Sequence, residues 1–248
     1  MDLGIDGKVA LVTGGSRLIG LAIAQRLGLE GAKVAICGRD SQRLEEAGHL
    51  LREQGIRAFT YPADVRDDAQ VEGLLQAVTE EFGGLDLLVN NPGGIVRTGP
   101  FSTVSLEEWR LGYEVNVVSI LRVVRAALPS LKAAPWGRIV NLGAFYVSPG
   151  TPGLLTELAE NAVAKTSVAA LTKVMSEELA PNITVNCVAP GPVGDAHAMR
   201  EMTRTFPIPR AADPGELADL VAFLCSRQAG YITGLTIPFD GGASRRLV

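Results

Sequence analysis

The chain has 248 residues, of which 47% are hydrophobic and 20% are charged, and its formal net charge is −4. A chain of this length and composition is an ordinary globular protein that can bury a sizeable core. The acidic balance argues against a general nucleic-acid or anionic-membrane surface, and no apolar run approaches the ~20 residues that a membrane span needs.

The N-terminal residues and the cysteines bear on the location of the protein. Residues 2–6 are acidic and contain no basic segment followed by an apolar stretch, so we predict no signal peptide. Cys37, Cys187 and Cys225 lie far apart in apolar runs, which is typical of buried free thiols in a reducing compartment. We therefore expect a cytoplasmic protein.

Short β-branched runs alternate along the chain with longer segments of helical period. The predicted strands are 9–13, 33–37, 58–62, 85–90, 138–142, 183–189 and 236–239, and most are apolar almost throughout. The predicted helices are 20–30, 41–54, 67–82, 105–133, 157–179 and 214–224. Continuous apolar strands are typical of parallel sheets that are buried on both faces.

The alternation of strands and helices predicts the fold class. Successive parallel strands joined by helices form right-handed crossovers. Gly31, Gly55 and Gly83 stand where three helices should stop, and each suits a residue in the left-handed region after a helix. The sequence therefore predicts an α/β fold, a Rossmann-type doubly wound parallel sheet of about seven strands with helices on both faces. No linker is visible, so we expect one dinucleotide-binding domain over residues 1–248.

A glycine-rich turn joins the first predicted strand to the first predicted helix. It reads Thr13-Gly-Gly-Ser-Arg-Leu-Ile-Gly20. Glycines at this point let the backbone approach a pyrophosphate, and the following helix start supplies free N–H groups and the positive end of its dipole. The turn therefore predicts a dinucleotide site.

The residues after the second strand indicate which dinucleotide is bound. An NAD site usually places a carboxylate there for the ribose 2′-hydroxyl, but this chain has Gly38 and Arg39. Arg39 and Arg17 can together grip a 2′-phosphate, because guanidinium groups bind phosphate bidentately. We predict NADP(H) as the cofactor; the alternative is that both arginines are solvated surface residues.

Several motifs in order give the chain a resemblance along nearly its whole length to the short-chain dehydrogenase/reductase family, of the 3-oxoacyl-carrier-protein reductase kind. They are the phosphate loop, Asp64-Val65, Asn90-Asn91-Pro92-Gly93, Val115-Asn116, Lys165, Pro190-Gly191 and Asp240-Gly241-Gly242. The resemblance implies the following cofactor-binding residues: Gly14, Ser16, Arg17, Ile19, Gly20, Arg39, Asp64, Val65, Asn90, Gly93, Lys165, Pro190, Gly191 and Val193. It also implies that Asn116 and Lys165 are the catalytic asparagine and lysine of the family.

Two family residues that carry the chemistry are replaced in this chain. In the family, a tyrosine protonates the substrate oxygen and a serine positions the carbonyl. The resemblance places Ala144 at the serine position and Asn161 at the tyrosine position, both facing the substrate. Alanine has no side-chain hydrogen bond to give, and asparagine cannot release a proton near neutral pH. General acid catalysis is typically worth ~10²–10⁴ in rate, so ordinary ketone reduction should suffer.

The segment between these two positions is longer than usual in the family. Tyr146 and Ser148 lie in it, and Tyr146 is our candidate for a displaced proton donor, although it also fits an ordinary half-buried aromatic residue. Glu157 and Glu160 stand near the expected start of a helix, where we expect them to interact favourably with the helix dipole.

Three smaller departures concern the cofactor. Leu18 replaces a family glycine and its side chain can crowd the pyrophosphate, Pro92 removes a backbone donor, and Asp195 replaces a threonine that often contacts the carboxamide. His197 lies in the presumed substrate lid, so it either faces substrate or is an exposed loop residue. Because His49 and His197 are the only histidines and lack ligand spacing, we expect no metal site.

These observations leave three functions open. The first is an atypical NADP(H)-dependent oxidoreductase that acts on a small carbonyl or unsaturated substrate with a non-standard proton donor. The second is a cofactor-binding but redox-inactive partner or auxiliary biosynthetic protein, and the third is a non-redox enzyme (a cyclase, lyase or isomerase) that reuses the pocket. Fold alone does not choose among them.

We also expect self-assembly, because family members pair through two long helices. The partners predicted are a small-molecule substrate and further copies of the chain in a homodimer or homotetramer, with no nucleic acid and no membrane. Apolar residues at helical spacing suit such an interface, namely Leu121, Val124, Leu128, Val168 and Leu171, although the same stripes can face the sheet instead.

Overall fold

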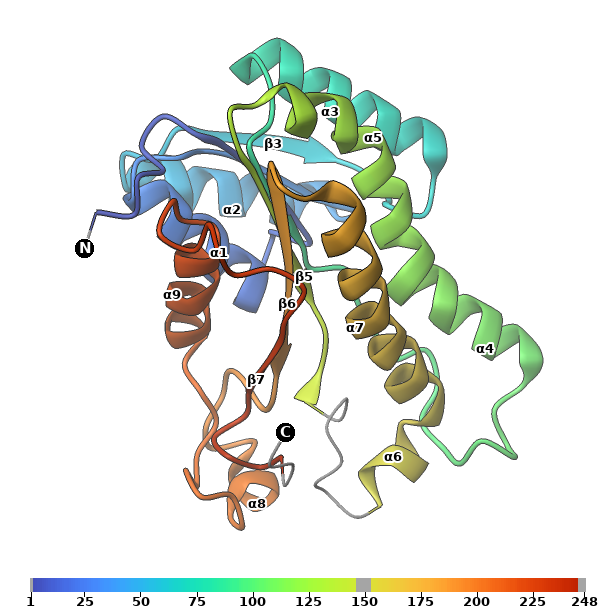
Figure 1. The fold of residues 1–248 in the computed structure, drawn as a ribbon. Coiled ribbons are helices and arrows are strands. Elements are labelled where there is room, and N and C mark those ends of the chain that lie inside the picture. The colour runs from blue at the N-terminus through green and yellow to red at the C-terminus, as the bar shows by residue number, and fades with distance from the viewer. Residues whose placement is uncertain (1, 146–152, 245–248) are drawn as a thin grey trace.

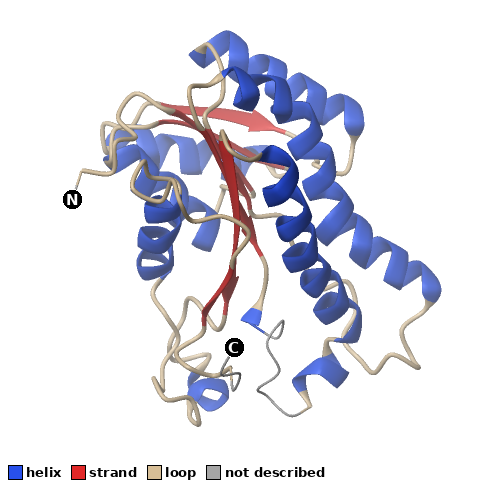
Figure 2. Ribbon diagram, in the orientation of Figure 1, coloured by secondary structure: helices blue, strands red, loops and turns tan. Residues whose placement is uncertain are grey.

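The computed structural model describes residues 2–145 and 153–244, and within them seven strands form one parallel sheet (Figures 1 and 2). The strands are β1 (Val9–Thr13), β2 (Lys33–Gly38), β3 (Ala58–Pro62), β4 (Leu87–Asn90), β5 (Gly137–Leu142), β6 (Ile183–Pro190) and β7 (Thr236–Phe239). Their order is β3-β2-β1-β4-β5-β6-β7, and every neighbouring pair is parallel. The predicted Rossmann-type fold is confirmed.

The strands form where the sequence is apolar on both faces. All five residues of β1 and all six of β5 are buried. At the centre of the sheet, Val12 is in register with Ile36 on one side and Val89 on the other. The predicted strand 85–90 begins two residues later, at Leu87. Just before it, the Asp86 carboxylate accepts hydrogen bonds from Val9 N (2.9 Å) and Lys8 Nζ (2.7 Å).

Helices cover both faces of the sheet, as Figure 1 shows. One face carries α1 (Leu18–Leu29), α2 (Ser41–Glu53) and α9 (Pro214–Leu224), and the other carries α3 (Asp68–Phe82), α5 (Ser119–Ala133) and α7 (Ala159–Leu179). Each face buries its own apolar cluster against the strands. The order of the strands reverses between β1 and β4, and the carboxyl ends at such a switch point are where ligands bind in open α/β sheets.

The predicted helix ends agree with local chemistry. Asp40 and Asp67 cap α2 and α3 by accepting from the backbone N–H three residues later. Gly31, Gly55 and Gly83 have φ values of 90°, 78° and 90°, so the left-handed residues expected after three helices are present.

The long helix predicted over 105–133 is three successive pieces. They are α4 (Leu106–Tyr113), a π-helical turn η1 (Glu114–Val118) and α5. The Asn116 side chain explains the interruption, because its Nδ2 donates to Gly112 O (2.9 Å), the carbonyl that would accept from the Asn116 backbone in an α-helix. π-turns of this kind often occur at functional sites.

The helix predicted over 157–179 also differs from the observed structure. A single turn, α6 (Leu154–Glu157), is separated from α7 by Leu158, whose φ and ψ of −117° and 36° are not helical. A further turn, α8 (Arg200–Thr203), was not predicted, because four residues with one apolar side chain, Met202, show no apolar period.

Two of the residues expected at an assembly interface are in the core instead. Val124 and Val168 are 4% and 0% exposed and pack against the sheet, so the prediction for them was wrong. Their apolar period reflects the buried side of α5 and α7. In the part of the chain that the structure describes, no helix combines the length and the apolar character needed to cross a bilayer.

Candidate dinucleotide and substrate site

The turn between β1 and α1 is packed so tightly that it requires glycine. Gly14 has a φ of 62°, and a Cβ there would lie 2.6 Å from Asn91 O. A Cβ on Gly20 would lie 2.1 Å from Gly14 O. Asn91 holds this turn from the β4 side, with its N donating to Thr13 Oγ1 (2.9 Å) and its Nδ2 to Gly14 O (3.2 Å). The turn therefore forms the close backbone cradle that a pyrophosphate needs.

The start of α1 offers donors that the protein itself does not use. Arg17, the N-cap residue, is extended (φ −163°, ψ 166°) and makes no side-chain cap, and the first turn contains no acidic residue. The first N–H groups of a helix lack intrahelical partners, so they are available to an anion. Ser16 and Ile19 are half-buried beside them. Leu18 has a φ of 43° and is 58% exposed, so a leucine occupies a left-handed position that favours glycine.

The residues after β2 and β3 carry the charges expected near the adenosine. Arg17 and Arg39 are both exposed, and neither forms an ion pair with a described residue. Arg66, which the sequence analysis missed, donates through Nε to both Asp64 oxygens (2.9 and 3.0 Å). This contact holds the pKa of Asp64 below its ordinary value, with the charges of Arg66 and Arg39 adding to the effect. An arginine two residues after the aspartate was the only available signal. Val65 is half-buried beside this pair.

A chain of buried amides links the strands beneath the site. Asn90 Nδ2 donates to Asn141 Oδ1 (2.9 Å), and Asn141 Nδ2 donates to Thr172 Oγ1 (2.9 Å) on α7. Asn90 is 0% exposed, and its Oδ1 has no hydrogen-bond partner within residues 2–145 and 153–244. The structure thus places Asn90 in the frame of the site, and its expected contact with the cofactor stays a prediction.

Lys165 is buried at the centre of the carboxyl edge. Its Nζ donates to Pro92 O and to Leu142 O, both at 3.0 Å, so it joins the segment after β4 to the end of β5. Only 7% of the residue is exposed. Burial lowers the pKa of the ammonium to about 8, because desolvation disfavours the charged form.

Asn116 and Asn161 converge on one carbonyl oxygen. Asn161 Nδ2 donates to Gly94 O at 2.8 Å, and Asn116 Nδ2 donates to the same oxygen at 3.1 Å. Asn116 Oδ1 is buried and has no hydrogen-bond partner in the part of the chain that the structure describes. Ala144, at the end of β5, is 8% exposed. Residue 161 therefore presents an amide one turn before Lys165, and residue 144 presents only a methyl group.

Glu160 lies in the first turn of α7, as predicted, but its carboxylate has a further role. It is 0% exposed, and its Oε1 accepts from Val96 N (2.7 Å) and Arg97 N (3.3 Å). Besides its position at the helix start, the carboxylate binds the segment that follows β4. That segment is far away in sequence, so the contact has no signature along the chain.

The segments after β6 and β7 form the other wall of the site. Gly191 lies so close to β7 that a Cβ would be 3.0 Å from Asp240 Cα. Val193 is buried, and Gly194 N donates to Ala212 O (3.0 Å). Phe206, after α8, packs against Phe145 at 6.3 Å between ring centroids. This contact joins the segment after α8 to the end of β5, next to Ala144.

Other predicted residues differ in their surroundings. Gly93 lies beside Lys165, since a Cβ there would be 3.1 Å from Lys165 Nζ, whereas His197 is exposed in the segment after β6, with its N donating to Asp195 Oδ1 (2.9 Å). Tyr146 and Ser148 lie outside the described residues. Cys37, Cys187 and Cys225 are buried free thiols, as predicted.

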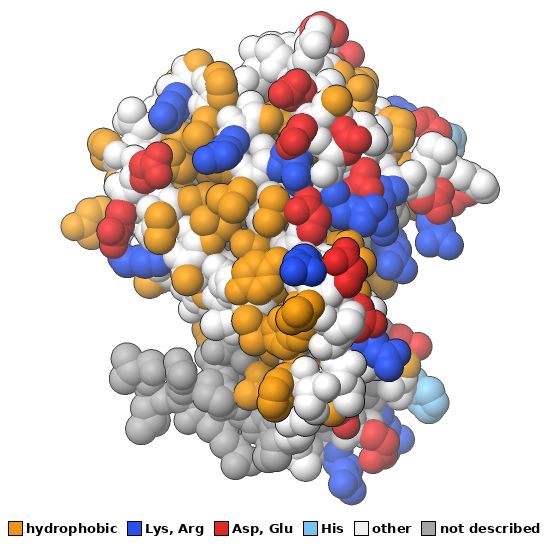
Figure 3. Space-filling model, turned by 90° about the vertical axis from the view of Figure 1, so that its right-hand side faces the viewer, with side chains coloured by type: hydrophobic (Ala, Val, Ile, Leu, Met, Phe, Trp, Pro, Cys, Tyr) orange, Lys and Arg blue, Asp and Glu red, His pale blue; other side chains and the backbone are white. Residues whose placement is uncertain are grey.

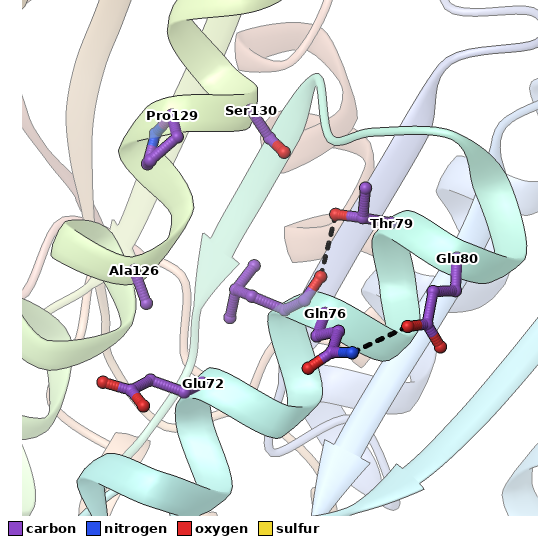
Figure 4. A pocket seen from close by; sticks show the side chains of 8 residues that line it. Glu72, Gln76, Thr79, Glu80, Ala126, Pro129 and Ser130 are labelled. Atoms are coloured by element: carbon purple, nitrogen blue, oxygen red, sulfur yellow. Dashed lines mark hydrogen bonds between the residues drawn. The ribbon is translucent and has the colours of Figure 1, made fainter.

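Two open grooves on the outer helices contain none of the predicted site residues. One, of about 480 Å³, lies between the second halves of α3 and α5 (Figure 4), and the other, of about 410 Å³, lies along α6 and α7. Because α3 and α5 run antiparallel to the strands, their second halves lie toward the amino edge of the sheet. The dinucleotide site is at the opposite edge.

Comparison with known proteins identifies the family. Residues 14–244 match the family model described as enoyl-(acyl carrier protein) reductase. The chain is 38% identical over 248 residues to a 3-oxoacyl-(acyl-carrier-protein) reductase of Vibrio cholerae (97% of this chain, 98% of that protein). It is 33% identical over 259 residues to the 2,3-dihydro-2,3-dihydroxybenzoate dehydrogenase of Bacillus subtilis (97% of each).

Solved structures agree with this relationship. A short-chain oxidoreductase of Pseudomonas aeruginosa, bound to NADPH and described as containing an atypical catalytic center, is 31% identical with a TM-score of 0.92 over 98% of this chain and 99% of that one. L-Sorbose reductase of Gluconobacter frateurii, complexed with NADPH and L-sorbose, is 32% identical with a TM-score of 0.90 over 100% of both chains. The chain belongs to the short-chain dehydrogenase/reductase family of NAD(P)-dependent oxidoreductases.

Proposed function

We propose that the protein is an NADP(H)-dependent oxidoreductase that acts on a small carbonyl or unsaturated substrate with a non-standard proton donor. The observation that carries the proposal is the Asn161 amide, which donates to Gly94 O one helical turn before Lys165. An amide can orient a substrate oxygen but cannot act as a general acid near neutral pH. A carbon–carbon double bond or an iminium-like substrate can instead take its proton from water.

The chain offers each part that a dinucleotide needs. The Gly14–Gly20 turn and the uncapped start of α1 would hold the pyrophosphate, and the Lys165 ammonium would hold the nicotinamide ribose. Asn90, Gly93, Pro190, Gly191 and Val193 would line the nicotinamide half. The cofactor, when bound, supplies the hydride.

Preference for NADP(H) over NAD(H) rests on charge. Gly38 and Arg39 replace the acidic residue of an NAD site, and the exposed guanidinium groups of Arg39 and Arg17 favour a 2′-phosphate. The two solved relatives described above contain NADPH, which supports the same preference.

We propose the following catalytic roles. Lys165 and Asn116 would act at the ribose and in proton transfer, while Ala144, Asn161 and His197 would face the substrate. Tyr146 is the proposed displaced donor. The relative described as containing an atypical catalytic center supports the idea that members of this family work without the usual set.

The test restores the missing family groups. We expect Ala144→Ser with Asn161→Tyr to keep NADPH binding and to gain only weak ketoreductase activity. The new tyrosine gives up the Asn161 bond to Gly94 O, and the longer segment before residue 161 need not bring its hydroxyl within ~3 Å of a substrate oxygen. The measurement is NADPH oxidation on carbonyl and conjugated-alkene panels, with Asn161→Tyr alone as the matched control. Robust activity of the unmodified protein on simple β-ketoesters would contradict the proposal, and Tyr146→Phe would then identify the donor.

A second candidate is a protein that binds the cofactor without redox turnover, or a non-redox enzyme that uses the same pocket. The hydrogen bonds of Lys165 and Asn161 to backbone carbonyls favour it, because these donors already have partners inside the protein. NADPH binding with no turnover on either panel would select this candidate.

We also propose assembly into a homodimer or homotetramer in a reducing, cytoplasmic location. Hydrophobic side chains gather over the helices on the face drawn in Figure 3. Leu111 and Tyr113 on α4, Leu155 on α6, and Val163 and Val174 on α7 are 36–62% exposed. The three free cysteines suit a reducing compartment. Light scattering at micromolar concentration should show an oligomer, and Val163→Glu with Val174→Glu should shift it toward monomer; a monomeric unmodified chain would contradict the assembly.

A further inference from the structure

We propose that Glu160 is a positioning residue that fixes residues 94–97 against α7, so that the segment after β4 forms a rigid wall of the dinucleotide site. The inference rests on the proposed function in one respect, that the wall faces a bound dinucleotide. The contacts that carry it belong to the protein alone.

Glu160 is an unusual buried group. It is 0% exposed, forms no ion pair with a described residue, and is held only by the backbone N–H groups of Val96 and Arg97. Its second oxygen, Oε2, is buried and has no hydrogen-bond partner among the described residues. Burying a carboxylate that has no cation is costly, and a stable fold does not need one here. Both of its charge-assisted hydrogen bonds hold one short segment, at Val96 and Arg97.

The fold makes room for this carboxylate. A Cβ on Gly112 in α4 would lie 2.1 Å from Glu160 Oε2, so the glycine allows the side chain to reach across toward residues 96 and 97. Gly112 O also accepts from Asn116 Nδ2 in the π-helical turn (2.9 Å). The carboxylate and the catalytic-position amide are therefore built against the same residue of α4.

Other side chains hold the same segment at its start. Lys165 Nζ binds Pro92 O, and both Asn116 and Asn161 bind Gly94 O. Glu160 differs from them because it accepts where they donate, and it holds the far end of the segment. Backbone that is fixed at both ends keeps Gly94 O aimed at the two amides, which in turn orients their remaining atoms. Farther along, Gly99 N donates to Glu157 O (2.7 Å), so Glu160 holds the backbone between the contacts at Gly94 and Gly99.

The experiment compares Glu160→Ala with Glu160→Gln. We expect amide hydrogen exchange at Val96 and Arg97 to speed up by about tenfold or more in Glu160→Ala, and NADPH affinity measured by fluorescence to fall by about tenfold. Glu160→Gln keeps a carbonyl oxygen for the two N–H groups, so it should restore most of both properties.

A matched control separates positioning from stability. Asp86→Ala removes another carboxylate that binds a backbone N–H, at Val9, but at the amino edge of the sheet. It should lower thermal stability while leaving exchange at residues 96–97 and the NADPH affinity within about twofold of the unmodified protein. If Glu160→Ala does not fold, Gly112→Ala displaces the carboxylate by its added Cβ and should give the same exchange pattern in milder form.

The outcomes distinguish the two proposals. Unchanged exchange at Val96 and Arg97 in Glu160→Ala would overturn the positioning role. Faster exchange with unchanged NADPH affinity would also overturn it, because the segment would then be structural only. If the unmodified protein fails to bind NADPH, the proposed function fails, and so does the claim that this wall serves a dinucleotide.

Discussion

Two halves of the same sheet edge are built in different ways. The phosphate loop after β1 is shaped by backbone, with glycines where any Cβ would collide and a helix start whose N–H groups stay available. The opposite half, after β4 and β5, is shaped by side chains, since Lys165, Asn116 and Asn161 all donate to carbonyls of the protein. The difference teaches that the backbone turn suited to a pyrophosphate does not depend on which side chains stand at the substrate positions.

The largest expected effect tests the backbone half. Gly20→Ala would place a Cβ 2.1 Å from Gly14 O, so the turn must open and we expect NADPH binding to fall by at least about a hundredfold. Fluorescence titration measures it. Gly7→Ala is the control for a general loss of stability, because its positive φ of 71° strains an alanine while nothing lies within 4 Å of the added Cβ. If both variants bind NADPH equally well, the tight turn is not the cofactor cradle.

The second prediction concerns charge at the adenosine end. Arg39→Ala should weaken NADPH by about 10–100-fold and leave NADH nearly unchanged, because a charge-assisted contact is worth roughly 1.5–3 kcal/mol. Arg43→Ala, one turn into α2 beside Asp40, is the control and should change neither. Equal or tighter binding of NADH by the unmodified protein would rule out the preference for NADP(H).

A third, smaller effect tests the side-chain half through pH. The buried Lys165 ammonium has a pKa of about 8, so it loses its charge as pH rises through that value. NADPH affinity should therefore fall severalfold, at most about tenfold, between pH 7 and pH 9. Lys165→Arg keeps its charge over this range and should show a flat profile.

The lowered pKa of Lys165 also predicts that the stability of the unliganded protein rises with pH, whereas the NADPH affinity falls. Its folded pKa of about 8 lies below the unfolded value of ~10.4, so the unfolded chain binds more protons between these values. The free energy of unfolding should gain a contribution that rises with pH from about 8 to ~10.4, and Lys165→Met should remove it. Chemical denaturation across this window is the measurement, and a contribution that falls with pH would show that the charged form is favoured in the folded state.

The smallest effect concerns Leu18, a leucine in the phosphate loop at a left-handed position that favours glycine. Leu18→Gly relieves a left-handed φ that costs roughly 1–2 kcal/mol but also loosens the unfolded chain, so stability should rise by less than ~1 kcal/mol. NADPH should bind about threefold more tightly if the side chain crowds the pyrophosphate. Leu18→Ala removes the bulk and keeps the strain, so it separates the two causes by titration and thermal unfolding.

Much of the fold was predictable because its signals are local. Continuous apolar runs gave the strands, and glycines after helices gave their ends within one or two residues. The interruption at Asn116 was not predictable from period, since it depends on one side chain binding the Gly112 carbonyl. The burial of Val124 on α5 and Val168 on α7 was not predictable either, because an apolar period does not say whether a helix face packs against the sheet or against a partner.

The sequence by itself determined the α/β fold, the glycine-rich cradle and the absence of hydroxyl groups at residues 144 and 161, because these depend on residue type and order. Only the tertiary structure decided what the remaining polar groups contact. Asn161 and Glu160 bind backbone of residues 94–97, more than sixty residues earlier in the chain. Arg66 binds Asp64, whereas the sequence shows only that the two residues are two positions apart. Such contacts depend on how separate helices and strand ends meet, and the order of residues along the chain does not give the distances between them.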